Sequence, residues 1–310
     1  MSYARVNDIA AASIPVIDVA PLFSAGHDGL AGVAREMLAA SESIGFFYIR
    51  NHGVPRALLD AVVAEAFAFF RRPQEQKLEV RVSPEHRGFI PVGEAKMYQS
   101  AKVDLKESFI WGLERVAANR WPAFQPGMQP LFEQHFQACH AVAWRLMRAF
   151  ATALGVAEDT FLRSIASPIS RGSAVYYPPQ PPDLGADQFG VAPHTDYGCL
   201  TLVYQANVGG LEVHGRGREW LLAHRIEDTF VVNVGDLLAR WTNDRFRSTP
   251  HRVVNRSGEE RLSLAVFVDP DDATRIEPVC RPGEAPRYPP VTCGEYIRSR
   301  FDKSFAYRQK

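Results

Sequence analysis

The chain has 310 residues, and 46% of them are hydrophobic, which is enough material for a large buried core. Its 35 basic and 35 acidic residues cancel, so no strong net field is available to hold nucleic acid or an anionic membrane, and neither is expected as a partner. No apolar run approaches the ~20 residues that span a bilayer, and the sequence opens without the basic and apolar stretches of a secretory signal.

The first third of the sequence mixes helix and strand patterns. Apolar residues recur at helical spacing over residues 30–40, and Gly45 is placed to end that helix. Residues 46–49 form an unbroken apolar run typical of a buried strand, whereas residues 51–53 predict a turn. Pro55 suits the first position of a second helix.

The second half of the sequence is richer in strand patterns. A long helix is expected over residues 131–150, ending at Gly155. After it the pattern changes to short β-rich runs separated by turn residues, at residues 174–177, 200–204, 230–234 and 262–268. Many short strands of this kind indicate a sandwich or a barrel.

The end of the chain is expected to return to helix. Thr292 and Glu295 form a capping box that begins a last helix, and a loose basic tail is expected beyond Phe301. No long linker or internal repeat divides the sequence. A single domain over residues 1–310 is therefore expected, with a β core and helices packed against it.

The cysteines give no sign of a disulfide framework. None of the four lies at CxxC spacing, so neither a zinc knuckle nor a thioredoxin-type pair is indicated; they are Cys139, Cys199, Cys280 and Cys293. Four reduced thiols in a cytoplasmic protein are the simplest interpretation.

His194-Thr195-Asp196 is the first informative triplet. On a strand, residues two positions apart project from the same face, so the imidazole of His194 and the carboxylate of Asp196 would converge on one point. The chain between this triplet and His251 holds enough short strands to return that residue to the same place. The sequence therefore predicts a metal site formed by His194, Asp196 and His251.

The composition of this site favours iron over structural zinc. Two histidines and one carboxylate leave metal positions open, as in the facial triad of non-haem iron(II) oxygenases, where a chelating cosubstrate and dioxygen must both bind. A structural zinc site would normally be closed by four protein ligands, often cysteines. None of the cysteines is placed to do so, because Cys199 would lie on the opposite face of a regular strand.

Arg261-Leu262-Ser263 repeats the period-two pattern, so a guanidinium and a hydroxyl should share one face of a strand. The planar fork of an arginine suits a carboxylate, and a buried arginine is costly unless an anion meets it. The sequence indicates an anion site here. An ordinary salt bridge to an acidic side chain stays open at this point.

The chain resembles the isopenicillin N synthase-like family of iron(II)/2-oxoglutarate-dependent oxygenases over nearly its whole length. Short motifs carry the resemblance, and they follow one another in the family's order. In the first half they are Ile14-Pro15-Val16-Ile17-Asp18, Gly45-Phe46-Phe47-Tyr48, Asn51-His52-Gly53-Val54-Pro55, Arg87-Gly88-Phe89 and Asp104-Leu105-Lys106-Glu107-Ser108-Phe109. In the second half they are His194-Thr195-Asp196-Tyr197-Gly198, Val232-Asn233-Val234-Gly235-Asp236, Ser248-Thr249-Pro250-His251-Arg252-Val253 and Arg261-Leu262-Ser263.

The resemblance implies an α+β fold with a mainly β core. That core would be a double-stranded β-helix, a cupin-like jelly roll, with N-terminal and flanking helices. Residues 1–120 would form the N-terminal helix and strand region, and residues 170–275 would form the jelly-roll core that carries the iron site.

The resemblance also implies the ligands of that site. The metal would be Fe(II), bound by the two histidines and the aspartate already singled out, and the cosubstrates would be 2-oxoglutarate and dioxygen. Arg261 and Ser263 would hold the distal carboxylate of 2-oxoglutarate, helped by Tyr177. The enzyme would then couple decarboxylation of 2-oxoglutarate to hydroxylation, desaturation or ring closure of a small-molecule substrate.

One position departs from the family pattern. Many members that use 2-oxoglutarate carry asparagine two residues before the tyrosine that corresponds to Tyr177, and here the residue is Val175. Valine cannot donate a hydrogen bond to a carboxylate near the metal. The departure bears on the cosubstrate and leaves the metal ligands unaffected.

Two other functions stay open. The first is an iron oxidase of the isopenicillin N synthase type, which needs no 2-oxoglutarate, keeps the Arg-x-Ser pair for another carboxylate and would consume dioxygen without 2-oxoglutarate. The second is a jelly roll that binds a metal or a ligand without turnover. An intact triad beside an intact Arg-x-Ser pair argues against this second function.

The substrate pocket is less readable from the sequence. By family position its candidate residues are aromatic, with one arginine that could meet an acidic substrate; they are Arg87, Phe89, Tyr98, Phe109, Trp111 and Phe267. Phe109 and Trp111 would share a face if that stretch is extended. Neither the identity of the substrate nor an oligomeric state can be read from these residues.

Overall fold

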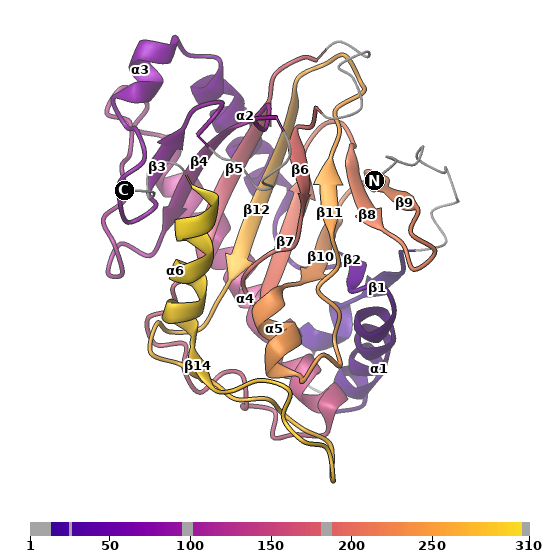
Figure 1. Cartoon of the computed structure of the whole chain (residues 1–310). Helices are drawn as coiled ribbons and strands as arrows, with labels where there is room; N and C mark the ends of the chain where they lie inside the picture. Colours follow the sequence, from indigo (N-terminus) through magenta and orange to yellow (C-terminus); the bar gives the residue numbers. More distant parts are fainter. Residues whose placement is uncertain (1–13, 25–26, 95–101, 181–187, 306–310) are drawn as a thin grey trace.

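The computed structural model describes residues 14–24, 27–94, 102–180 and 188–305. Strands make up its centre and helices flank them (Figure 1). The strands are β1 (Val16–Asp18), β2 (Phe46–Arg50), β3 (Gly88–Ile90), β4 (Glu107–Gly112), β5 (Arg171–Tyr177), β6 (Val191–His194), β7 (Leu200–Gln205), β8 (Leu211–His214), β9 (Trp220–Ala223), β10 (Phe230–Val234), β11 (His251–Val253), β12 (Arg261–Val268), β13 (Arg275–Ile276) and β14 (Val291–Thr292). The helices are the short 3-10 helix η2 (Ala20–Phe23), α1 (His27–Ser43), α2 (Arg56–Phe70), α3 (Gln74–Leu78), α4 (Met128–Leu154), α5 (Asp236–Trp241) and α6 (Cys293–Ser304).

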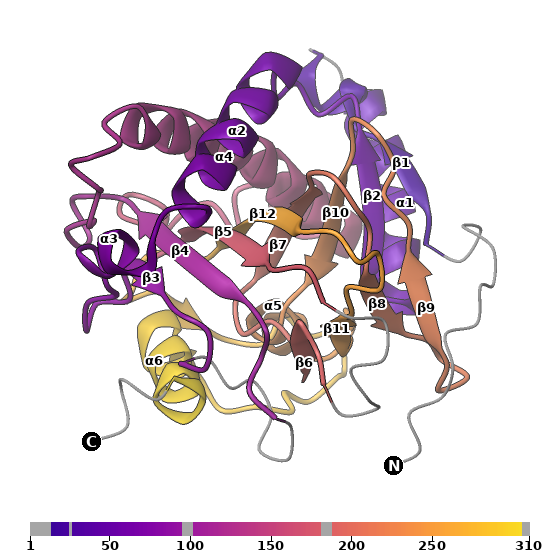
Figure 2. The same cartoon turned by 90° about the horizontal axis from the view of Figure 1, so that it is seen from above.

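Two sheets form the expected double-stranded β-helix. The larger sheet runs β1-β2-β10-β7-β12-β5-β4-β3, and the smaller runs β6-β11-β8-β9. Seen from above, α2 and α4 lie on one side of the larger sheet and the smaller sheet lies on the other (Figure 2). The mainly β core with N-terminal and flanking helices is therefore confirmed.

The N-terminal region contributes strands to the larger sheet. β2 pairs with β10, and β4 pairs with β5, both in antiparallel fashion. The apolar run in β2 has a simple explanation, because both faces of that strand are covered. Phe46 and Tyr48 pack between the two sheets, whereas Phe47 and Ile49 pack toward the helices.

The helix boundaries follow the local signals closely. Gly45 ends the turn after α1 with a φ of 72°, and a Cβ there would lie 2.1 Å from the carbonyl oxygen of Arg247, so glycine is required at this position. The capping box of Thr292 and Glu295 is present at the start of α6. Pro55 is the N-cap residue of α2 and not its first helical residue.

The end of the chain differs from the sequence-based expectation. α6 continues to Ser304 instead of ending in a loose tail at Phe301. Both Phe301 and Phe305 are 8% exposed, because each packs against the imidazole ring of His86 at a centroid distance of 4.6 Å. None of the helices in the described ranges combines the length and the apolar character needed to cross a membrane.

Lys77 and Glu107 form a buried ion pair between α3 and β4. The Nζ atom of Lys77 lies 2.6 Å from Oε2 of Glu107 and also donates to the carbonyl oxygen of Phe70 at 3.1 Å. Replacing Lys77 by methionine would leave the carboxylate buried without its partner, so the free energy of unfolding should fall by about 3–5 kcal/mol in urea denaturation. The double variant Lys77→Met/Glu107→Leu should recover most of that loss; a single variant as stable as the parent would contradict this expectation.

Candidate active site

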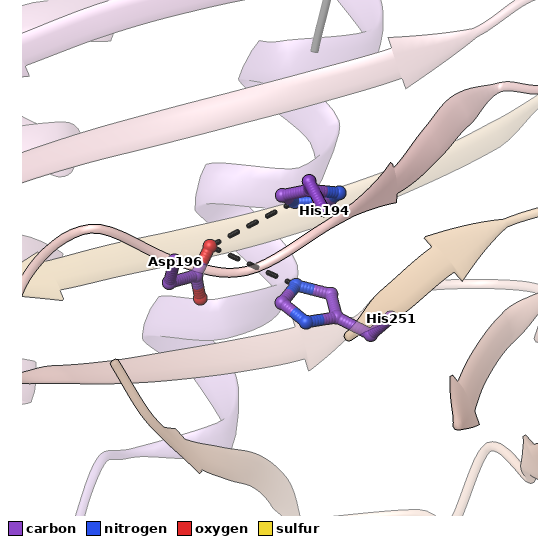
Figure 3. Close-up of side chains that lie close together, drawn as sticks. All are labelled: His194, Asp196 and His251. Carbon is purple, nitrogen blue, oxygen red and sulfur yellow. Dashed lines mark ion pairs between the residues drawn. The ribbon is translucent and has the colours of Figure 1, made fainter. Parts of the chain in front are cut away.

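Three ligand side chains meet at the mouth of the jelly roll. His194 ends β6, Asp196 lies two residues beyond that strand, and His251 begins β11 (Figure 3). The Oδ1 atom of Asp196 lies 3.8 Å from Nε2 of His194 and 3.7 Å from Nε2 of His251. One ligand atom from each residue lies within 4.8 Å of the others, which is close enough for a single ion to touch all three.

Asp196 reaches the site from the loop after β6, and only His194 of the pair lies on the strand. The expected alternation of side chains along a strand therefore does not explain the position of the carboxylate. Two side chains fix the carboxylate by donating to Oδ2: the hydroxyl of Thr201 at 2.6 Å and the amide of Asn233 at 2.7 Å. Oδ1 is thereby left to face the histidines. The loop itself is held by α5, because the backbone N–H of Asp236 donates to the carbonyl oxygen of Asp196 at 2.7 Å.

Both imidazoles are oriented by backbone carbonyls. The Nδ1 atom of His194 lies 2.9 Å from the carbonyl oxygen of Ala192, and Nδ1 of His251 lies 3.1 Å from that of Thr249. A carbonyl oxygen can only accept, so Nδ1 carries the proton and Nε2 keeps its lone pair for a metal.

The protonation states suit metal binding. Burial, and then the charge of His251, lower the pKa of His194 to about 3, so this ring is neutral near neutral pH. Burial opposes ionisation of Asp196, but the electrostatic influence of the two histidines and the hydrogen bonds from Asn233 and Thr201 outweigh it and hold the pKa of Asp196 below its ordinary value. Two imidazoles and one carboxylate match the donor set of a non-haem iron(II) centre.

Asp236 links the two loops that carry the metal ligands. Its Oδ1 atom accepts a hydrogen bond of 2.7 Å from the hydroxyl of Ser248, three residues before His251. It also accepts one from the side chain of Thr195, between His194 and Asp196. Asp236 therefore positions both loops without contacting the metal itself.

Replacing Asp236 by alanine should weaken Fe(II) binding by roughly 10- to 100-fold, because partners that orient metal ligands contribute effects of that size. Fe(II) titration of the metal-free protein under anaerobic conditions measures the change. Asp244→Ala is the matched control, because Asp244 pairs with Arg287 and Tyr288 at the surface. Equal iron affinity in the two variants would show that Asp236 has no positioning role.

Arg261 is 1% exposed although it carries a full charge. Its Nε atom donates to the carbonyl oxygen of Gly209 at 2.8 Å, and a terminal nitrogen lies 3.3 Å from the hydroxyl oxygen of Ser263. The guanidinium also stacks over the ring of Tyr177 at 4.7 Å. No carboxylate of the described residues forms an ion pair with Arg261, so its charge is suited to a bound anion.

Strand β5 connects the surroundings of Arg261 to the pocket beside the triad. β12 pairs with β5 in the register Arg261 with Tyr177 and Ser263 with Val175. Alternate residues of β5 share one face, so Val175 lies on the same face as Tyr177. Val175 also lines the pocket that contains His194. A molecule placed between the sheets could therefore span from the triad to Arg261.

A pocket with about 690 Å³ of empty space, including open solvent, lies beside the triad. Strands β3, β4, β5 and β12 form one wall and the end of α6 forms another. Besides the triad residues His194 and Asp196, the lining residues are His86, Ile90, Lys106, Ser108, Ile110, Arg171, Ser173, Val175, Thr195, Tyr197, Gly198, Phe267, Phe301 and Phe305.

Among the expected substrate residues that lie in the described parts of the chain, the structure brings only Phe267 to this pocket. Phe109 and Trp111 do share a face, but that face packs toward the helices. Phe109 contacts Phe69 of α2 at 5.1 Å between ring centroids, and Trp111 contacts Phe132 of α4 at 4.6 Å. The pocket receives the alternate residues of β4, and the expectation for Phe109 and Trp111 is therefore wrong.

Phe89 and Arg87 are also displaced from their expected places. Phe89 is fully buried in the helix-side core, and its neighbour Ile90 lines the pocket instead. Arg87 is buried beside the pocket, where it donates to the carbonyl oxygen of His86 at 3.1 Å, and it does not line the pocket itself. Tyr98 lies outside the described residues.

Several residues of the site were missed from the sequence. Asn233 and Asp236 belong to a motif that carried the family resemblance but received no role. Arg171, Phe301 and Phe305 had no motif to mark them, and only the fold brings them to the triad.

The sequence and the structure both have relatives of known class. Residues 172–270 match the 2OG-Fe(II) oxygenase superfamily, and residues 14–128 match the N-terminal region of the non-haem dioxygenases in morphine synthesis. The chain is 31% identical to the 2-oxoglutarate-Fe(II) type oxidoreductase hxnY of Emericella nidulans, with 94% of this chain and 90% of the relative covered. It is 32% identical to homoarginine-6-hydroxylase 2-ODD-233 of Oryza sativa subsp. japonica, covering 92% and 95% of the two chains.

A solved structure agrees with these matches. A full-length protein of Neurospora crassa, solved in complex with alpha-KG and thymine, superposes with a TM-score of 0.86 at 30% identity, covering 94% of this chain and 96% of that one. The open His-Asp-His site fits the same chemistry. The chain therefore belongs to the 2OG-Fe(II) oxygenase superfamily and is an Fe(II)- and 2-oxoglutarate-dependent dioxygenase.

Proposed function

We propose that His194, Asp196 and His251 bind Fe(II), and that Arg261, with Ser263 and Tyr177, holds the distal carboxylate of 2-oxoglutarate. One observation carries this proposal. A buried guanidinium without a carboxylate partner among the described residues lies opposite Tyr177 on β5, and Val175 on the same face of β5 lines the pocket that holds His194 and Asp196. 2-Oxoglutarate is a dicarboxylate, and its two ends would meet the metal and the guanidinium.

Bound iron and 2-oxoglutarate would supply the oxidising chemistry, and the chain would supply position and shielding. The carbonyls of Ala192 and Thr249 keep both Nε2 atoms ready for the metal. Thr201 and Asn233 hold the carboxylate of Asp196 in one orientation. The apolar cluster between the sheets excludes water from the path between the triad and Arg261.

The substrate proposed for this enzyme is a small molecule that undergoes hydroxylation, desaturation or ring closure. The pocket beside the triad is lined by apolar and polar side chains together, as small-molecule sites are. Thymine and homoarginine, taken from the names of the relatives, are reasonable first compounds to test.

Val175 is the residue that sets this chain apart from many users of 2-oxoglutarate. It is 8% exposed and lines the pocket near His194, where its side chain offers no hydrogen bond. The guanidinium of Arg261 would then provide most of the hydrogen bonds and charge interactions that the chain makes with the cosubstrate. A cosubstrate-independent oxidase, which the relatives do not favour, would instead consume dioxygen without forming succinate.

The test is anaerobic addition of Fe(II) and then 2-oxoglutarate to the metal-free protein. A visible metal-to-ligand charge-transfer band should appear on chelation at an open triad. Stoichiometric succinate should follow when dioxygen and a substrate are admitted. Iron binding without the band and without succinate would overturn the assignment of Arg261 to 2-oxoglutarate.

We also propose that residues 1–310 act as one domain in the cytoplasm. Strands of the N-terminal region belong to the same sheet as β5, β7, β10 and β12, which supports a single unit. All four cysteines are free thiols, as expected for a reducing compartment. Cell fractionation with a tagged chain tests the location, and limited proteolysis tests the single unit.

A further inference from the structure

The pocket beside the triad has an apolar wall and a cationic one. Phe267 of β12 and Phe301 of α6 present aromatic rings to it, while Lys106 and Arg171 bring positive charge. An aromatic wall suits a planar or apolar body, and a guanidinium suits a carboxylate. The two features together indicate a substrate with both parts.

Arg171 is held rigidly with its charge toward the pocket. Its guanidinium carbon lies 4.5 Å from the centroid of the Phe301 ring and 6.0 Å from that of Phe267. A terminal nitrogen lies 3.3 Å from Oδ2 of Asp269, a fully buried residue that does not line the pocket. The carboxylate of Asp269 therefore contacts the guanidinium from the side away from the pocket. The guanidinium of Arg171 has several N–H donors in one plane, so it can also donate to an acceptor inside the pocket.

Cationic side chains gather at this end of the pocket. Lys106 is half-buried, lines the pocket and forms no ion pair within the described parts of the chain. Arg87 lies behind the wall, where burial and then the charge of Arg171 lower its pKa to about 10, against opposing influences from Glu114 and Glu85. Lys106 and Arg171 thus bring two cationic groups to the described lining of this end of the pocket, with Arg87 behind them, so an anion would be attracted.

The strands place this cationic end opposite the cosubstrate end. On β5 the residues Arg171, Ser173, Val175 and Tyr177 share one face. On β12, Phe267 pairs with Arg171 and Arg261 pairs with Tyr177. An acid held by Arg171 therefore does not compete with the carboxylate that Arg261 would hold, because six residues of extended strand separate the two positions by roughly 20 Å.

We propose that the substrate of this enzyme is a small organic acid with a planar or apolar body, whose carboxylate binds Arg171 with support from Lys106. The body packs between Phe267 and Phe301 and presents its carbon atoms to the triad. This inference rests on the proposed function, because it names the substrate class of the same site.

The experiment measures binding of two acids and their neutral isosteres to the anaerobic enzyme loaded with Fe(II) and saturating 2-oxoglutarate. The acids are benzoate and phenylacetate, and their neutral isosteres are benzamide and phenylacetamide. Binding is measured by thermal shift and by perturbation of the charge-transfer band. The acids should bind about tenfold or more tightly than the amides. Saturating 2-oxoglutarate keeps the probes away from Arg261.

Variants assign the preference to the pocket. Arg171→Gln should bring the acid-to-amide ratio close to one while 2-oxoglutarate binds as before, and Lys106→Gln should reduce the ratio in part. Arg171→Lys keeps the charge beside Asp269 and should retain a weaker preference, which covers the case that Arg171→Gln folds poorly. Arg275→Gln is the control, because Arg275 is exposed and pairs with Glu277.

Three results would overturn the proposal: equal binding of acids and amides, no binding of either acid, or an undiminished preference in Arg171→Gln. The proposed function has a separate readout. If the charge-transfer band never forms in the parent protein, the cosubstrate assignment fails, whereas thermal shift still reports whether the pocket prefers acids.

Discussion

Asp196→Ala is expected to abolish iron binding in the micromolar range and, with it, all succinate formation. The variant removes the anionic ligand of the set and leaves two imidazoles. Loss of a residue that merely orients a metal ligand weakens metal binding by up to roughly a hundredfold, so loss of the ligand itself should raise the Fe(II) dissociation constant by more than that. Anaerobic Fe(II) titration and a succinate assay on the same samples measure the two effects.

The fold of this variant needs a separate check, because the substitution also removes an acceptor. The hydroxyl of Thr201 and the amide of Asn233 would lose their partner, at a cost of about 1–3 kcal/mol for each buried donor left unpaired. Asp196→Asn keeps one oxygen for these donors and should be more stable than alanine while still binding iron weakly. Asp159→Ala is the matched surface control, because Asp159 pairs with Arg163 in the open. Iron affinity within about tenfold of the parent in Asp196→Ala would rule out this carboxylate as a ligand.

The metal site was predictable from the sequence because its residue types are rare in combination and lie in short motifs. The spacing of two residues between His194 and Asp196, however, wrongly predicted that both lie on one strand. His194 is the last residue of β6, and Asp196 belongs to a loop. Its orientation depends on Thr201, Asn233 and the start of α5, which are contacts between segments and leave no periodic signal in the sequence.

The substrate pocket was less predictable for a specific physical reason. β4 is buried on both faces, so its residues show no alternation of apolar and polar types from which to tell the faces apart. Phe109 and Trp111 were expected in the pocket by their family position. In the structure a Cβ on Gly172 would lie 2.2 Å from the indole of Trp111, so this glycine makes room for the indole on the helix side.

The burial of the end of α6 was not predictable from the sequence either. Phe301 and Phe305 lie four residues apart and would share one face of a helix, but the basic residues around them favoured an exposed tail. Their burial arises from distant partners: His86 packs against both rings, and Arg171 stacks on Phe301. A short hydrogen bond of 2.5 Å between the hydroxyls of Tyr197 and Ser304 also ties the helix to the residue after Asp196.

Arg261→Gln is expected to weaken 2-oxoglutarate binding by roughly 30- to 3,000-fold, because removing one partner of a buried, hydrogen-bonded charge pair costs about 2–5 kcal/mol. Iron affinity should stay near that of the parent, since Arg261 does not contact the triad. Titration with 2-oxoglutarate, followed by the charge-transfer band, measures the loss. Arg261→Lys keeps the charge but not the planar fork, so its affinity should fall between those of the parent and Arg261→Gln.

A second comparison separates the loss of the carboxylate contact from a general disturbance of the site. Pyruvate has the same keto-acid end as 2-oxoglutarate but no distal carboxylate. The parent should strongly prefer 2-oxoglutarate, and Arg261→Gln should bind the two compounds with similar affinity, because the contact that distinguishes them is gone. Ser263→Ala should reduce the preference only a few-fold, since one neutral hydroxyl contributes about 1 kcal/mol. If Arg261→Gln weakened both compounds equally, the guanidinium would be supporting the sheet through Gly209 and Gln205, and the distal carboxylate would be bound elsewhere.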